Sequence, residues 1–136
     1  MALSKIAVTS ADLPSGSVLQ VITANKLDTF STTSLTYVDV TGLSVQITPS
    51  STSSKILVTG ALVCSATNHW IFARLIRDST QVLTPSGSIG NRTTANFGFG
   101  ESHTGNYMPH TLPIHALDSP SSTCLLYTSD AADDGL

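Results

Sequence analysis

The sequence predicts an all-β protein in which antiparallel strands form a β-sandwich, a jelly roll or a barrel. Serine and threonine make up 39 of its 136 residues, and β-branched residues occur throughout. The chain has a single glutamate, Glu101, and only three lysines, too few to build long exposed helical faces. Short apolar runs recur at intervals of roughly 8–12 residues with turn-forming residues between them, a pattern typical of sandwiches, jelly rolls and barrels.

The N-terminal half predicts four strands. Residues 18–24 form the first, after a turn at residues 14–17 whose proline and glycine favour chain reversal. Residues 28–48 read as strand, turn and strand, with the turn at Thr41 and Gly42 and an alternating apolar face after it. Residues 55–66 are apolar on both alternating faces, which predicts a strand that is central in a sandwich or covered by a neighbouring subunit.

The C-terminal half continues the pattern. Residues 69–77 form another strand, and Asp78 and Ser79 then turn the chain into a hairpin partner at residues 81–83. Further strands are predicted at residues 92–99 and 111–117, and Pro113 places the latter at a sheet edge or a bulge. The segments 85–91 and 100–109 between these strands are polar and longer than a turn requires.

Charge and hydropathy exclude several classes of protein. The net charge is −3 and charged residues are 11% of the chain, while hydrophobic residues are 40%, a balance that disfavours global disorder. The six basic residues are scattered, so no basic stripe is available for nucleic acid. No apolar run approaches the roughly 20 residues that span a bilayer, and the first ten residues do not resemble a signal peptide. We therefore expect neither nucleic-acid binding nor membrane insertion.

Several segments resemble a family of marine bacteriophage proteins that are described as tail-fibre-like or virion structural proteins. The resemblance covers about residues 16–121 and is most specific over residues 27–58. It rests on LDTFSTTS at residues 27–34, YVDVTGLSVQITP at 37–49, SSKILV at 53–58, residues 72–80, LDSP at 117–120 and the opening residues 1–6. It implies an antiparallel β-sandwich head domain of jelly-roll-like type, located in the virion and truncated at its C-terminal end, because the family pattern normally continues past residue 120. It also implies that the domain forms a homotrimer, and that other virion proteins are its partners. It implies no catalytic residue.

The last residues resemble something different. Residues 124–134 match the translation of a transposon-type sequencing adapter, which reads Cys-Leu-Leu-Tyr-Thr-Ser-Asp-Ala-Ala-Asp followed by Asp or Glu. The resulting hypothesis divides the chain into an N-terminal segment at 1–15, an incomplete β-sandwich domain at 16–123 and an adapter-derived tail at 124–136. If residues 127–133 persist in assembled genomic DNA, the adapter hypothesis is wrong.

Residues with metal or redox chemistry give no pattern of a site. Cys64 and Cys124 are too few for a disulfide framework, and Cys64 on its apolar strand is typical of a small buried hydrophobe. None of the four histidines has the spacing that holds a metal on one element, and His110 and His115 fall on opposite faces of a strand. We expect no cofactor and no metal.

Catalytic patterns are absent as well. The chain has no Gly-x-Ser-x-Gly elbow, and a pair of glycosidase carboxylates would have to be two aspartates because there is a single glutamate. Trp70 and Phe72 have the chemistry to stack on sugars, but their position within an apolar strand favours core packing. We predict that the protein is not an enzyme.

Binding through the two long loops is the function that these observations favour, because binding residues are often carried on loops held by a rigid scaffold. The candidate host-contact residues are Ser88, Asn91, Arg92, His103, Asn106 and Tyr107. The partner would be a glycan or protein of the host cell surface. Two alternatives stay open: a decoration protein of the virion without receptor contact, and a bacterial carbohydrate-binding or adhesin module.

Overall fold

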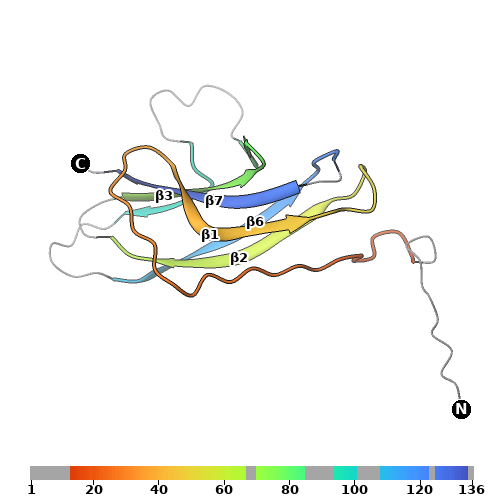
Figure 1. Cartoon of the computed structure of the whole chain (residues 1–136), viewed down its shortest axis with the longest axis horizontal. Helices are drawn as coiled ribbons and strands as arrows, with labels where there is room; N and C mark the ends of the chain where they lie inside the picture. The colour runs from red at the N-terminus through yellow and green to blue at the C-terminus, as the bar shows by residue number, and fades with distance from the viewer. Residues whose placement is uncertain (1–12, 67–69, 85–93, 101–107, 123–124, 135–136) are drawn as a thin grey trace, which may run out of the picture.

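The computed structural model describes residues 13–66, 70–84, 94–100, 108–122 and 125–134. These residues form seven β-strands and no helix. Figure 1 shows two layers of strands packed face to face, so the predicted all-β antiparallel sandwich is confirmed. The strands are β1 (Val38–Ile47), β2 (Ile56–Cys64), β3 (Trp70–Arg77), β4 (Thr80–Gln81), β5 (Phe97–Gly100), β6 (His110–Asp118) and β7 (Leu125–Asp134).

The strands are divided unequally between the two sheets. The larger sheet has the order β1-β7-β3-β4, and β5 pairs with β3 beside β4. The smaller sheet consists of β2 and β6 alone. Every pairing is antiparallel. The jelly-roll topology stays a prediction, because it requires a strand order that this five-plus-two arrangement does not establish.

Strand β1 is continuous where a turn was predicted at Thr41 and Gly42. The pairing of β1 with β7 shifts between Asp39 and Ser44: β1 advances five residues from Asp39 to Ser44 while β7 moves two, from Asp130 to Thr128. Gly42 has a φ of +85°, a conformation that glycine adopts without strain. The three extra residues therefore form a bulge that changes which alternate side chains of β1 face the core.

The predicted hairpin after β3 forms, but its second strand, β4, covers Thr80–Gln81 and not residues 81–83. Arg77 pairs with Thr80 across a two-residue turn, in which Asp78 has a φ of +55°. Asn96 fills the gap between β4 and β5 along the edge of β3: its side-chain oxygen accepts from the Leu75 N–H, and its amide nitrogen donates to the Val82 carbonyl. A side chain thus continues the ladder where no strand is present.

The strand predicted at residues 18–24 does not form. Residues 17–25 are extended and run alongside β2 without pairing to it (Figure 1). Their side chains are largely exposed, with Val18 and Val21 each at 77%. A strand needs a partner ladder as well as β-favouring residues, and this segment has the residues without the ladder.

Strand β7 occupies the centre of the larger sheet, between β1 and β3 (Figure 1). It pairs with β3 along eight positions, from Trp70↔Asp134 to Arg77↔Tyr127, and with β1 along six. Leu125 and Tyr127 are 1% and 2% exposed. The segment that the adapter hypothesis assigns to a foreign tail is thus an integral strand of the folded chain, whatever the origin of its codons.

The core lies between the two sheets. It is built from residues of both layers that alternate inward along their strands, as the period of two requires. Its buried members are Ile56, Leu75, Val82, Ala116, Leu125 and Tyr127.

One polar cluster joins the sheets at the end where β3, β6 and β7 meet. The Asp118 carboxylate of β6 accepts from the Arg77 guanidinium at 2.6 Å and from the Tyr127 hydroxyl at 2.7 Å. The other oxygen of Asp118 accepts from the Ser119 N–H. Burial and the neighbouring Asp118 carboxylate raise the pKa of Tyr127 well above its usual value. The phenol therefore stays protonated in the folded protein at pH values where it ionises in the unfolded chain.

Tyr127 should therefore make stability fall at high pH. Above a pH of about 10 the unfolded chain loses the phenol proton and the folded chain keeps it, so the unfolding free energy falls by up to about 1.4 kcal/mol per pH unit. The substitution Tyr127→Phe removes this contribution, and at pH 7 it costs the hydrogen bond to the Asp118 carboxylate, about 1.5–3 kcal/mol. Urea denaturation of both proteins between pH 7 and 11 measures the effect, and an equal loss in the two would contradict it.

Candidate functional site

The candidate host-contact residues predicted from the sequence lie outside the residues that the structure describes; they are Ser88, Asn91, Arg92, His103, Asn106 and Tyr107. Their role therefore stays a prediction. The described residues contain a different candidate, on the outer face of the larger sheet. There, aromatic side chains of β3 adjoin an ion pair and a tyrosine.

Trp70 and Phe72 form the centre of this surface, which we call the aromatic platform. They are two residues apart on β3, so they project from the same face of the sheet. Their rings are 6.5 Å apart between centroids and 11° from parallel. Trp70 is 50% exposed, and Phe72 is half-buried. The two rings therefore present a broad apolar surface that is open to solvent at Trp70.

Two glycines of β5 let the rings lie close to the neighbouring strand. Trp70 pairs with Gly100 and Phe72 pairs with Gly98. A Cβ atom at Gly100 would lie 2.6 Å from Cδ2 of Trp70, and one at Gly98 would lie 3.0 Å from the ring of Phe72. Any side chain at Gly100 would therefore displace the indole. The two glycines therefore leave the room that the rings of Trp70 and Phe72 occupy beside β5.

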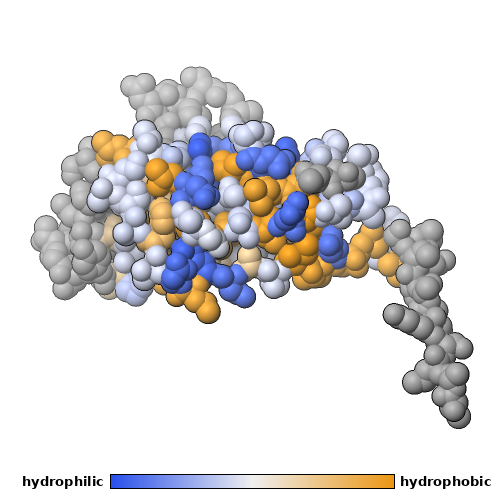
Figure 2. Space-filling view, in the orientation of Figure 1, coloured by the Kyte–Doolittle hydropathy of each residue, from blue (hydrophilic) through white to orange (hydrophobic). Residues whose placement is uncertain are grey.

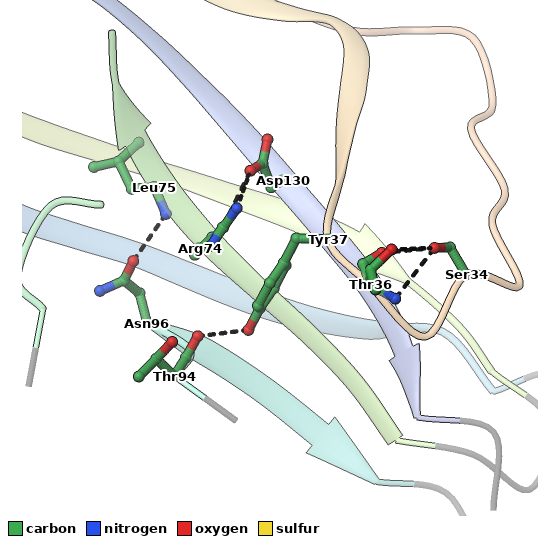
Figure 3. A network of polar contacts seen from close by, with 8 residues as sticks. All are labelled: Ser34, Thr36, Tyr37, Arg74, Leu75, Thr94, Asn96 and Asp130. Atoms are coloured by element: carbon green, nitrogen blue, oxygen red, sulfur yellow. Dashed lines mark hydrogen bonds and ion pairs between the residues drawn. The ribbon is translucent and has the colours of Figure 1, made fainter. Parts of the chain in front are cut away.

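A cation and a carboxylate continue the platform along β3. Arg74 is the next residue on this face, and its guanidinium donates from Nε and Nη2 to Asp130 of β7, at 3.1 and 2.8 Å. The guanidinium carbon lies 4.1 Å from the ring centre of Tyr37, a cation–π contact. Figure 3 shows these three side chains above the strands, with Tyr37 reaching across from the chain before β1.

Tyr37 is fixed at both ends. Its hydroxyl donates to the Thr94 carbonyl at 2.7 Å, and its ring lies against Arg74 (Figure 3). Burial raises the pKa of Tyr37, while the Arg74 charge opposes that change. The phenol therefore stays neutral and remains a donor over the ordinary pH range. The ion pair, the ring and the hydroxyl together form a rigid polar border beside the aromatic platform.

The platform corrects the expectation that Trp70 and Phe72 pack in the core. The inward side chains of β3 are Ala73 and Leu75, which are buried, whereas Trp70 is half exposed on the other face. The sequence did carry a signal for this arrangement. The alternation Phe97-Gly98-Phe99-Gly100 leaves one face of β5 without side chains, which is where rings from an adjacent strand can lie.

The other residues considered for chemistry are separate from the platform. Cys64 is a half-buried free thiol at the end of β2, and burial raises its pKa. His110 faces inward against the ring of Phe99, at 4.5 Å between centroids, and His115 is exposed on the opposite face of β6. Within the described ranges no three histidine, cysteine or acidic side chains cluster in a way that could hold a metal.

No helix with the length and hydropathy to cross a membrane occurs among the residues that the structure describes. Comparison of the chain with protein-family models, with curated proteins and with solved structures finds no match. The interpretation of the site therefore rests on its own geometry.

Proposed function

We propose that this chain is a structural protein of a phage virion, the jelly-roll-like head domain of a tail fibre or appendage, and that it binds the surface of the host cell. Its activity is binding, without a catalytic step. The resemblance of residues 27–58 to tail-fibre-like proteins supports the virion assignment, and a rigid β-sandwich suits a domain that presents a binding surface.

The aromatic platform is the observation that carries the binding proposal. The apolar C–H face of a pyranose ring packs on the electron-rich face of an aromatic ring, and the half-exposed indole of Trp70 offers such a face beside the nearly parallel ring of Phe72. Arg74, Asp130 and the polar edge of Tyr37 stand beside the rings, where hydroxyl groups of a bound sugar find both donors and acceptors. We therefore propose a surface glycan as the ligand.

A second candidate function is a virion decoration role without receptor contact. The exposed apolar side chains of β2, such as Leu57 and Val63, favour a scaffold that is mainly covered by neighbouring proteins. A bacterial adhesin or carbohydrate-binding module would bind its ligand through the same aromatic platform, but a bacterium would encode it and not a phage. Neighbouring genes distinguish these origins: tail and head genes would support the virion, and secretion genes would support the adhesin.

The substitution Trp70→Ala tests the glycan proposal. The full chain is screened on an array of bacterial surface polysaccharides, and the affinity of each hit is measured by calorimetry. We expect Trp70→Ala to weaken binding at least tenfold, equivalent to about 1.4 kcal/mol, because it removes the exposed half of the platform.

Two further variants complete the test. Leu126→Ala removes an apolar side chain that is 42% exposed on the same sheet, and it should leave affinity unchanged. Gly100→Ala keeps Trp70 but displaces its ring, and it should weaken binding as well. Equal binding by Trp70→Ala and the unmodified chain would show that the platform is not the site, and the absence of any glycan hit would overturn the glycan proposal.

A further inference from the structure

The smaller sheet has an apolar outer face. Leu57, Ala61 and Val63 of β2 project outward, beside Pro113 and Leu117 of β6, which pair with Ala61 and Leu57. Leu57 is 68% exposed, Val63 is 73% exposed and Leu117 is 55% exposed. Three large apolar side chains are thus exposed on this face, Leu57 and Leu117 as a pair at one end and Val63 at the other, with the polar pair Thr59–His115 between them. This face includes the outward side of β2, whose sequence is apolar on both alternating faces.

The edge of β2 is open and lacks the devices that normally protect an edge strand. Within the described residues β2 pairs with β6 alone, so its other edge carries unpaired N–H and C=O groups. Ile56–Cys64 contains no charged residue and no proline. The β6 edge differs, because Pro113 interrupts its row of donors. An unprotected edge is a template for pairing with another strand.

The segment at residues 17–25 has the properties of the missing strand. It reads SVLQVITAN, has no charge and no proline, and is extended. Only its first residue, Ser17, makes a hydrogen bond, from its N–H to the Pro14 carbonyl and likewise from its hydroxyl. Apolar residues lie on both of its alternating faces, with Leu19 and Val21 on one and Val18 and Ile22 on the other. Such a strand fits an edge that is apolar both inside and outside.

A large hollow separates this segment from the sheets of its own copy. The cavity has a volume of about 1490 Å³ and is lined by residues 15–25 together with apolar inner residues, among them Val45, Ile47, Val58 and Leu62. Figure 2 shows hydrophobic residues at the surface on this side of the molecule. The hollow is open to solvent and its apolar inner residues are left uncovered, so it offers a surface on which an added strand can pack. The chain's own segment lies beside the hollow and leaves it open.

We propose that this surface joins copies of the chain by strand exchange: residues 17–25 of one copy pair with the β2 edge of a second copy. One face of the added strand then covers the hollow, and the other extends the apolar face formed by Leu57 and Val63. The exchange is reciprocal, because each copy gives residues 17–25 to the β2 edge of the other. One contact between two copies therefore pairs both open edges and both segments. This inference concerns assembly alone and stands whether or not the protein binds a glycan.

Sedimentation velocity of the full chain over a hundredfold range of concentration tests the proposal. We expect an oligomer that dissociates on dilution. Val21→Pro removes a backbone donor in the middle of the segment, and since that N–H makes no hydrogen bond in the single copy, folding is preserved. The variant should raise the dissociation constant at least a hundredfold. The matched control is Leu27→Pro, at an exposed apolar residue outside the segment, which should change it less than threefold.

Hydrogen exchange identifies the strand and isotope labelling identifies its source. The amides of residues 18–24 should be protected in the oligomer and unprotected in Val21→Pro. In a mixture of labelled and unlabelled copies, contacts between residues 17–25 and β2 should appear between copies. A chain that is monomeric throughout the range, an oligomer unaffected by Val21→Pro, or contacts confined to one copy would each overturn the proposal.

Discussion

A chain ending at Thr123 is expected to lose its cooperative fold. The truncation removes all of β7, which pairs with β1 on one side and with β3 on the other. Leu125 and Tyr127, two of the most deeply buried side chains, leave the core with it. Loss of one such large side chain costs about 2–5 kcal/mol, and the whole stability of a typical domain is about 5–15 kcal/mol. The sum of the lost burial and the two lost ladders therefore exceeds what a domain of this size can spare.

Far-UV circular dichroism and thermal denaturation measure this effect. A chain ending at Asp134 is the control, because it retains every residue of β7, and it should melt as the full chain does. A chain ending at Thr123 that keeps the β spectrum and the melting temperature of the full chain would contradict the prediction. It would also favour the interpretation of residues 124–136 as an appended tail.

Leu125→Ala is expected to destabilise the protein by about 2–5 kcal/mol, the usual cost of deleting a fully buried leucine side chain. Leu125 is 1% exposed and belongs to the core cluster with Leu75 and Ile56. The magnitude depends on how far the sheets close over the cavity that remains. Urea denaturation monitored by fluorescence gives the unfolding free energy of the variant and of the unmodified chain.

The adjacent residue provides a matched control for this substitution. Leu126 faces the opposite side of β7 and is 42% exposed, so Leu126→Ala should change stability by less than about 1 kcal/mol. The pair thus tests the register of β7 directly, since a shift of one residue exchanges the two faces. Equal effects, or a larger effect at Leu126, would contradict the register described above.

Local patterns in the sequence predicted the elements whose partners are close along the chain. The β3–β4 hairpin follows from Asp78 and Ser79, whose side chains and permitted conformations favour a tight turn. Residues 55–66 were predicted as a strand from their apolar content, and β2 lies within them. Pro113 was placed at an edge, and it lies in a two-stranded sheet.

Elements that depend on distant partners were not predicted. Residues 18–24 have strand-forming side chains but no ladder within one copy, so propensity alone gave the wrong result. At the other end, the alternation of Leu125, Tyr127 and Ser129 is a strand signal, and all three side chains are buried. The adapter hypothesis assigned the same residues to a foreign tail, and neither pattern reports where in a sheet a strand inserts.

The aromatic platform could not be predicted without the register between β3 and β5. Trp70 and Phe72 look like core residues while β3 is considered alone, because apolar side chains occur on both of its faces. Only the pairing with Gly98 and Gly100 shows which face has room for the rings. The contact of Arg74 with Tyr37 joins residues 37 positions apart, and no local pattern relates them.

The central place of β7 also determines when the molecule can fold. Within the described residues, β1 and β3 are joined in one sheet through β7, which follows both of them in the sequence, so the larger sheet cannot close before β7 has been synthesised. Pairing Val38 with Ala131 closes a loop of most of the domain, and such non-local contacts slow folding. Until then the facing edges of β1 and β3 are exposed on the nascent chain, where they are prone to pair with other chains. Synthesis of β7 should therefore precede closure of the larger sheet, and chaperone dependence should be highest before β7 pairs.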